Sequence, residues 1–363
     1  MGRHKKNFVA PVDEQELPKK PKRAYSTEEA EYPLQKQFFQ DVKRIVPSAS
    51  LDIIEVMTRL FDVSIDSAYR RARGQSALSL DEAIALCKHY NMPLSSLLHL
   101  KEDGLVFDYH ILNSVDAFKR YLQGLLSALE KVGKEQGQLL YAADDVPIFY
   151  HFKHKEHAAF KIYTWLRSVL RLAEFEDAYF DVSIIPADLL ELAMELYNSY
   201  TKVNSTEIWT SRSADATIAQ ITGYWEMGLL RSKQQAQQII TQFVDIIRES
   251  QRMTYRGEKG TGATYKLYES AEPAGTNYVL AKAKDEEFCY IRVQSFNTIV
   301  TQNEIFCRDA EMFLDLHMSS STLIGGTNDL LRLKFFNNII LKLEATANTI
   351  KDDNRWGDQQ KNF

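Results

Sequence analysis

Two helical patterns of apolar residues are separated by two residues, Asp62 and Val63, and this short connection constrains the fold more than any other feature of the sequence. The first pattern covers residues 51–61. The second follows Ser64, a residue type that caps helix N-termini, and ends at Gly74, a residue type that often follows a helix. A connection of this length allows only a tight corner between two packed helices.

Three further amphipathic patterns surround this pair of helices. Residues 33–46 begin with a proline suited to the first helical position, residues 80–91 follow a serine cap, and residues 94–100 form a short leucine-rich turn. Five helices of this size can close one small core together. We therefore expect an all-α, five-helix domain over residues 33–100.

The rest of the chain is divided around that domain. Residues 1–32 lack apolar periodicity, and their first 23 positions hold seven Lys and Arg against three Asp and Glu, which predicts a flexible basic arm. Both a DNA-contacting arm and a solubilising tail fit this composition. At 363 residues the chain exceeds one core, so we expect a linker at 101–104, a regulatory or oligomerisation domain over 105–351 and a disordered tail at 352–363.

The larger domain contains segments with the helical repeat of apolar residues and segments with the apolar–polar alternation of strands. We therefore expect an α+β fold rich in helices. No internal repeat is present. The expected helices cover 115–132, 156–172, 187–201, 213–228, 232–253 and 327–350, and the expected strands cover 105–109, 139–142, 148–152, 266–268, 278–283 and 288–301.

The helix that follows the tight corner has the chemistry of a DNA-reading helix. In bihelical DNA-binding motifs the second helix enters the major groove while the first braces it. The helical period turns Ala68 inward, and Arg70 and Arg73 are suited to guanine edges or phosphates. Arg71 is a phosphate-contacting or structural residue. The other side chains expected to face outward or sideways are Asp66, Ser67 and Tyr69.

This region resembles the phage repressor and Cro-like (XRE) family of helix-turn-helix regulators over about residues 34–100. The resemblance lies in FDVSIDSAYRRARG at 61–74, LSLDEA at 78–83 and YNMPLSSLL at 90–98. The chain has Thr58 where the family usually has Ala, and Asp62 where it usually has Gly. The resemblance implies a lambda-repressor-like fold with base-facing residues at Ile65, Asp66, Ser67, Tyr69 and Arg70. With the helix start and the remaining arginines, the predicted DNA-binding residues are Ser64, Ile65, Asp66, Ser67, Tyr69, Arg70, Arg71 and Arg73.

These features predict a sequence-specific, DNA-binding transcription regulator that reads double-stranded DNA as a homodimer, because one helix reads too few base pairs for useful selectivity. The C-terminal domain would serve sensing of an unidentified effector or dimerisation. Residues 101–363 hold 29 Lys and Arg against 36 Asp and Glu, so repulsion keeps that part off DNA. One alternative is a protein-interaction adaptor. Another is an enzyme, favoured if Asp144, His151 and Glu156 share a deep pocket.

Neither a metal site nor a cofactor site is expected. His151, His154 and His157 are spaced three apart, which places the outer pair poorly on one helix, and no fourth ligand is near. The glycine-bearing loop at 257–263 lacks the Gly-Lys-Ser/Thr ending of a phosphate-binding loop. We expect this loop to be a flexible connection.

The sequence also indicates a cytoplasmic protein. No run of apolar residues is long enough to span a membrane, and no secretion signal follows Met1. Cys87, Cys289 and Cys307 are odd in number and widely spaced, which favours reduced thiols that pack in the core.

Overall fold

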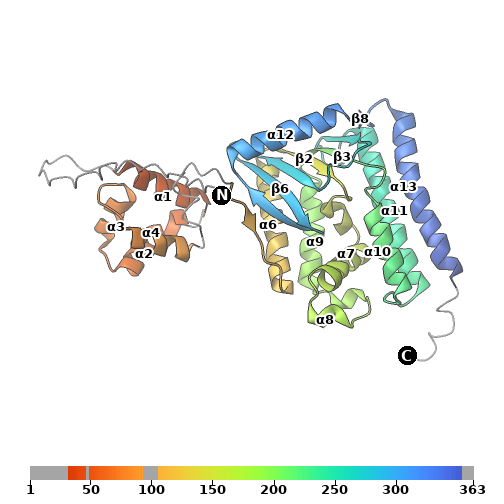
Figure 1. The fold of residues 1–363 in the computed structure, drawn as a ribbon, viewed down its shortest axis with the longest axis horizontal. Helices are drawn as coiled ribbons and strands as arrows, with labels where there is room; N and C mark the ends of the chain where they lie inside the picture. Colours follow the sequence, from red (N-terminus) through yellow and green to blue (C-terminus); the bar gives the residue numbers. More distant parts are fainter. Residues whose placement is uncertain (1–31, 46–48, 91, 93–104, 354–363) are drawn as a thin grey trace, which may run out of the picture. The chain divides into compact units, whose positions relative to one another are not determined.

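A computed structural model describes residues 32–45, 49–90, 92 and 105–353 (Figure 1). The chain forms two compact units, Met1–Asp103 and Gly104–Phe363, and each is described by itself. The boundary between them falls within the four residues expected to be a linker. That linker, the basic arm up to residue 31, the helix expected at 94–100 and positions 354–363 of the expected tail lie outside the described residues.

The N-terminal unit is all-helical in its described part. Its helices are α1 (Pro33–Ile45), α2 (Ala49–Phe61), α3 (Ile65–Ala72) and α4 (Leu80–His89). Each helix contributes one apolar face to a single small core. The buried members of that core are Phe38, Phe39, Val42, Ile53, Val56, Met57, Ala68, Leu86, Cys87 and Met92.

Local signals explain how α2, α3 and α4 begin and end. Asp62 adopts a left-handed conformation with φ of 50°, which turns the chain sharply after α2. Asp is one of the few residue types besides Gly that visit this region. The Ser64 side chain then accepts a hydrogen bond from the backbone N–H of Ser67 and so caps α3. Ser79 and Glu82 form a reciprocal capping box at the start of α4.

Eight strands form one mixed sheet in the described part of the C-terminal unit. The strands are β1 (Asp108–Tyr109), β2 (Gln138–Ala143), β3 (Asn204–Trp209), β4 (Tyr265–Glu269), β5 (Tyr278–Lys282), β6 (Glu287–Gln294), β7 (Asn297–Thr301) and β8 (Thr322–Leu323). Their order across the sheet is β1-β7-β6-β5-β2-β3-β4-β8. β2, β3 and β4 run parallel, whereas the other neighbours pair antiparallel.

Helices connect the parallel strands and cover the sheet. The chain passes through helices between β2 and β3 and again between β3 and β4, as parallel pairing requires. The α-helices of this unit are α6 (Val115–Lys134), α7 (Lys155–Thr164), α8 (Ala173–Glu176), α9 (Ala187–Tyr200), α10 (Asp215–Glu226), α11 (Lys233–Arg256), α12 (Glu304–Ser319) and α13 (Asp329–Asp352). Two short 3-10 helices, η1 (Ile148–Phe152) and η3 (Val182–Ile184), and one π-helical turn, η2 (Trp165–Val169), complete the unit.

The two faces of the sheet pack against different helices (Figure 1). Alternate residues of β2 show the division, because side chains on a strand point to opposite faces. Leu139 and Tyr141 join the large core beneath α6, α9 and α11, whereas Leu140 and Ala142 join a smaller core beneath α12. Among the described residues, no helix is long and apolar enough to cross a membrane.

The expected mixed fold is confirmed, but two local predictions were wrong, and both the strand β3 and the helix α12 were not predicted. Residues 148–152 form a 3-10 helix instead of a strand, because the chain turns after Pro147 and both sides of this short segment are buried. Residues 288–301 belong to two strands joined by a turn. The helix α12 was not predicted, because its apolar residues do not keep to one face, as Ile305 and Leu316 are both largely exposed. Cys87, Cys289 and Cys307 are free and buried.

Candidate functional site

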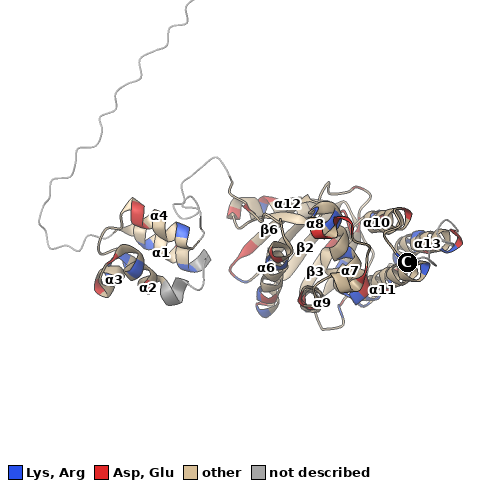
Figure 2. Cartoon of the chain, turned by 90° about the horizontal axis from the view of Figure 1, so that it is seen from below, with Lys and Arg blue, Asp and Glu red and all other residues tan. Residues whose placement is uncertain are grey.

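The α3 helix presents a varied polar face to solvent. Ala68 is fully buried against the core of the N-terminal unit, whereas Ile65 is 62% and Tyr69 is 46% exposed. The charged side chains on the exposed side are Asp66, Arg70 and Arg73, and the basic character of α3 is visible in Figure 2. One face of α3 therefore anchors the helix while the other remains available to a partner.

Tyr69 of α3 and Arg73, the residue that directly follows the helix, support each other. The Arg73 guanidinium carbon lies 5.6 Å from the centre of the Tyr69 ring, which is within the range of a cation–π contact. This contact limits the freedom of both side chains and leaves the edge of the guanidinium open to hydrogen-bond acceptors.

Arg71 and Ser67 are engaged with other residues of the unit. The Arg71 Nη1 donates to the Ser67 hydroxyl at 2.6 Å, and its Nη2 lies 3.4 Å from a Glu82 carboxylate oxygen. The Arg71 and Glu82 side chains are each 19% exposed. These contacts join α3 to the start of α4, so the geometry of Arg71 is that of a structural residue.

A glutamine on α1 holds the end of α3 in place. The Gln35 Nε2 donates to the backbone carbonyls of Arg71 at 2.6 Å and Ser76 at 2.8 Å, and its Oε1 accepts from the Leu78 N–H at 2.7 Å. One side chain thus satisfies three backbone groups of the turn after α3. Sequence reasoning missed Gln35 because its partners lie 36 to 43 positions away and no spacing rule connects them.

Gly74 allows the chain to turn closely beside α1. Its φ is 74°, and a Cβ atom built there would lie 3.0 Å from the Tyr32 carbonyl oxygen. The Tyr32 N–H donates to the Gly74 carbonyl at 2.9 Å. Only glycine combines the positive φ with this close approach.

The surface of the N-terminal unit is net positive where its side-chain exposure is described. Asp41 is buried and Glu82 is paired with Arg71, which reduces the negative charge at the surface. The exposed charged side chains are Lys36, Lys43, Arg59, Arg70, Arg73 and Lys88 against Glu55, Asp62, Asp66 and Asp81. This described surface is therefore attractive to a polyanion.

The three histidines of the C-terminal unit do not converge on one point. The His151 Nδ1 lies 3.1 Å from the His157 Nε2, whereas the His154 Nε2 lies 2.8 Å from an Asp245 oxygen. Burial lowers the pKa of His157 to about 3 and that of His151 well below its usual range, so both are neutral. Among the described residues, no group of three His, Cys, Asp or Glu side chains is arranged to hold a metal ion.

The glycine-bearing loop at 257–263 is part of a buried polar cluster. Lys259 is buried, its Nζ donates to the Tyr200 carbonyl at 3.0 Å, and the ammonium lies 3.4 Å from the centre of the Tyr200 ring. Burial lowers the pKa of Lys259 to about 7. The loop that we expected to be a flexible connection therefore buries one of its side chains, that of Lys259.

Glu207 lies at the centre of the same cluster. Its carboxylate is fully buried, accepts from the Trp209 indole at 2.9 Å and the Ser205 hydroxyl at 3.2 Å, and also contacts the Tyr200 hydroxyl. Burial raises the pKa of Glu207, and nearby Lys259 opposes this effect most strongly. No motif predicted this arrangement, because its members come from separate strands and helices.

The chain was also compared with known proteins. No protein-family model, curated protein or solved structure matches it.

Proposed function

We propose that this chain is a sequence-specific, DNA-binding transcription regulator with a helix-turn-helix N-terminal domain. The observation that carries the proposal is the division of α3 into a buried side at Ala68 and an exposed side bearing Tyr69, Arg70 and Arg73. A tight corner at Asp62 and a brace from Gln35 hold this helix against α2 and α1. This is the arrangement by which a bihelical motif offers its second helix to the major groove.

The exposed side chains have separate roles in the proposed complex. Arg70 and Arg73 donate to guanine edges or to phosphates, and the Tyr69 ring orients the Arg73 guanidinium through the cation–π contact. Asp66, in the first turn of α3, accepts from the amino group of a cytosine. Ile65 makes apolar contact with a thymine methyl group.

We further propose that the regulator acts as a homodimer in the cytoplasm. Two copies of α3 placed about 34–36 Å apart would read half-sites separated by one helical turn of DNA. The C-terminal unit is large enough to provide dimerisation or effector sensing. The free, buried cysteines are compatible with a reducing compartment.

DNA binding can be tested with the full chain. Duplexes selected from a random pool would first define a site, and fluorescence anisotropy across a salt series would then give the affinity. The double variant Arg70→Ala/Arg73→Ala is expected to weaken specific binding by at least about 30-fold, because each good arginine–base pair contributes about 1–3 kcal/mol. It should also reduce the dependence of affinity on salt.

A variant with the same charge change controls for non-specific electrostatics. Lys266→Ala/Arg308→Ala removes two exposed cations of the C-terminal unit and is expected to leave specific binding nearly unchanged. Equal losses for the two double variants, or the absence of any salt-sensitive DNA binding, would overturn the proposal. Absence of DNA binding would favour the adaptor hypothesis, in which the exposed face of α3 binds a protein.

A further inference from the structure

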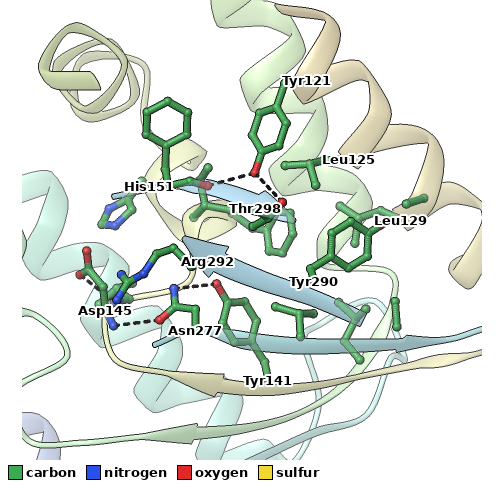
Figure 3. A pocket seen from close by; sticks show the side chains of 18 of the residues that line it. Tyr121, Leu125, Leu129, Tyr141, Asp145, His151, Asn277, Tyr290, Arg292 and Thr298 are labelled. Carbon is green, nitrogen blue, oxygen red and sulfur yellow. Dashed lines mark hydrogen bonds between the residues drawn. The ribbon is translucent and has the colours of Figure 1, made fainter. Parts of the chain in front are cut away.

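The C-terminal unit contains a pocket between α6 and the sheet face formed by β2, β5, β6 and β7 (Figure 3). The pocket has a volume of about 80 Å³, several times the space that one water molecule requires. It gathers His151 but neither Asp144 nor Glu156, so it does not contain the constellation that would favour an enzyme. Glu156 instead accepts a hydrogen bond from Gln242 at 2.6 Å.

One part of the pocket is apolar. Leu125 and Leu129 of α6 face the sheet across the cavity, and Figure 3 shows them apart from the charged side chains. Val279 and Ala281 line the pocket from β5. This part of the wall is suited to a hydrocarbon or aromatic group, because such a group loses its contact with water there.

The other part of the pocket is polar and lies where β2 ends and β5 begins. Asp145 follows β2, Asn277 directly precedes β5, and the Arg292 N–H of β6 donates to the Asn277 carbonyl at 3.0 Å. The Asn277 Oδ1 accepts from the Asp144 N–H at 2.9 Å, and its Nδ2 donates to the Tyr141 hydroxyl at 3.3 Å. Ligands of sheets with parallel strands commonly bind beyond the carboxyl ends of those strands.

Two carboxylates, Asp144 and Asp145, and two cations, Lys161 and Arg292, lie near one another at this polar end. Asp145 accepts a hydrogen bond from the Val146 N–H at 2.9 Å and lies in the fields of two cations, Lys161 and Arg292. The Lys161 ammonium donates to Thr217 and Gln220. By contrast, the half-buried Arg292 guanidinium makes no hydrogen bond or ion pair with any residue that the structure describes. A guanidinium with five donors facing a pocket is a site for an anion.

His151 adds a neutral polar group to the same end of the pocket. Its ring is 1% exposed, and its Nδ1 contacts His157. Its Nε2 is buried and has no hydrogen-bond partner among the described residues. A buried ring nitrogen in this situation gains from a polar ligand atom beside it.

We propose that this pocket binds a small organic acid, with its carboxylate on Arg292 and its apolar body between α6 and β5. The carboxylate accepts two parallel hydrogen bonds from the guanidinium, which has no acceptor among the residues that the structure describes. The apolar body covers Leu125, Leu129 and Val279. This inference does not depend on DNA binding, because acid binding is measured with the chain alone.

The test compares acids with uncharged molecules of the same shape. The full chain would be titrated by calorimetry and ligand-observed NMR with butanoate, hexanoate, octanoate, benzoate and phenylacetate, and with the matching primary amides. At least one acid is expected to bind at millimolar concentration or below. Its amide should bind at least about tenfold more weakly, as the loss of a charge-assisted hydrogen bond predicts. No binding by any acid, or equal binding by acid and amide, would overturn the proposal.

Variants then locate the bound acid. Arg292→Met should weaken acid binding by at least about tenfold, whereas Arg120→Met, at an exposed position of α6 outside the pocket, should not change it. Arg292→Lys should retain part of the affinity because the charge remains. If Arg292→Met does not fold, Leu125→Trp, which fills the apolar part, should abolish binding. Unchanged binding in a folded Arg292→Met or Leu125→Trp variant would refute this location.

Discussion

In the described part of the N-terminal unit, Asp41 is the one buried charged side chain, whereas the C-terminal unit buries Lys161, Glu207, Lys259 and Arg332. The small unit has a core of apolar side chains and carries its candidate chemistry on the outside of α3. The large unit has enough apolar volume to surround charged groups, and burial changes their pKa values. Substitutions in the two units should therefore have different effects. Those at exposed positions of α3 should affect binding, whereas those at interior polar positions of the C-terminal unit should affect stability.

The largest expected effect tests the interior polar cluster. Glu207→Ala leaves the Trp209 indole and the Tyr200 hydroxyl without their acceptor and leaves Lys259 without its nearest opposite charge. Loss of one partner from such a buried group destabilises a protein by about 3–5 kcal/mol. Urea unfolding should show this loss, while Glu195→Ala, at an exposed position of α9, should stay within about 0.5 kcal/mol of the unaltered chain. A small effect of Glu207→Ala would remove the contrast between the units.

The second effect is a dependence of stability on pH that arises from Lys259. Burial lowers its pKa to about 7 in the folded chain, from an ordinary value of 10.5. Between pH 7 and about pH 10 the unfolded chain therefore binds more protons at this residue, and the free energy of unfolding rises with pH. In this window, unaltered chain and Lys259→Met should differ in slope by up to about 1.4 kcal/mol per pH unit. Parallel stability curves would show that Lys259 keeps its charge when buried.

The smallest of these effects concerns the turn that positions α3. Gly74→Ala places a Cβ atom 3.0 Å from the Tyr32 carbonyl oxygen at a φ of 74°, and we expect a local destabilisation of about 2 kcal/mol. Gly257→Ala has a similar φ of 72° but meets no atom within 4 Å, so it should lose only about 1 kcal/mol. Hydrogen exchange should accelerate in α1 and α3 for the first variant and at the end of α11 for the second. Equal effects would show that the close approach to Tyr32 has no energetic weight.

The features that could be predicted from the sequence are those that depend on neighbouring residues in the chain. The corner between α2 and α3 follows from a two-residue connection, from the tolerance of Asp62 for positive φ, and from the Ser64 cap. The helical period alone places Tyr69 and Arg70 on the exposed side of α3.

What the sequence did not predict depends on contacts between distant segments. Gln35 meets its partners only because α1 packs beside the turn after α3. Asn277 and Arg292 meet because of the register of β5 and β6, which is a property of the whole sheet. The pocket and the Glu207 cluster therefore could not be derived from spacing along the chain.

The brace formed by Gln35 separates the placement of α3 from its surface chemistry. Gln35 binds backbone carbonyls of Arg71 and Ser76, and Ala68 anchors the helix from below, so none of these contacts uses the exposed side chains. Side chains such as those of Tyr69 and Arg70 can therefore be replaced without loss of the contacts that hold α3 in place. New combinations of residues at these positions would alter the surface that α3 presents to solvent without changing the contacts that hold the helix in the small unit.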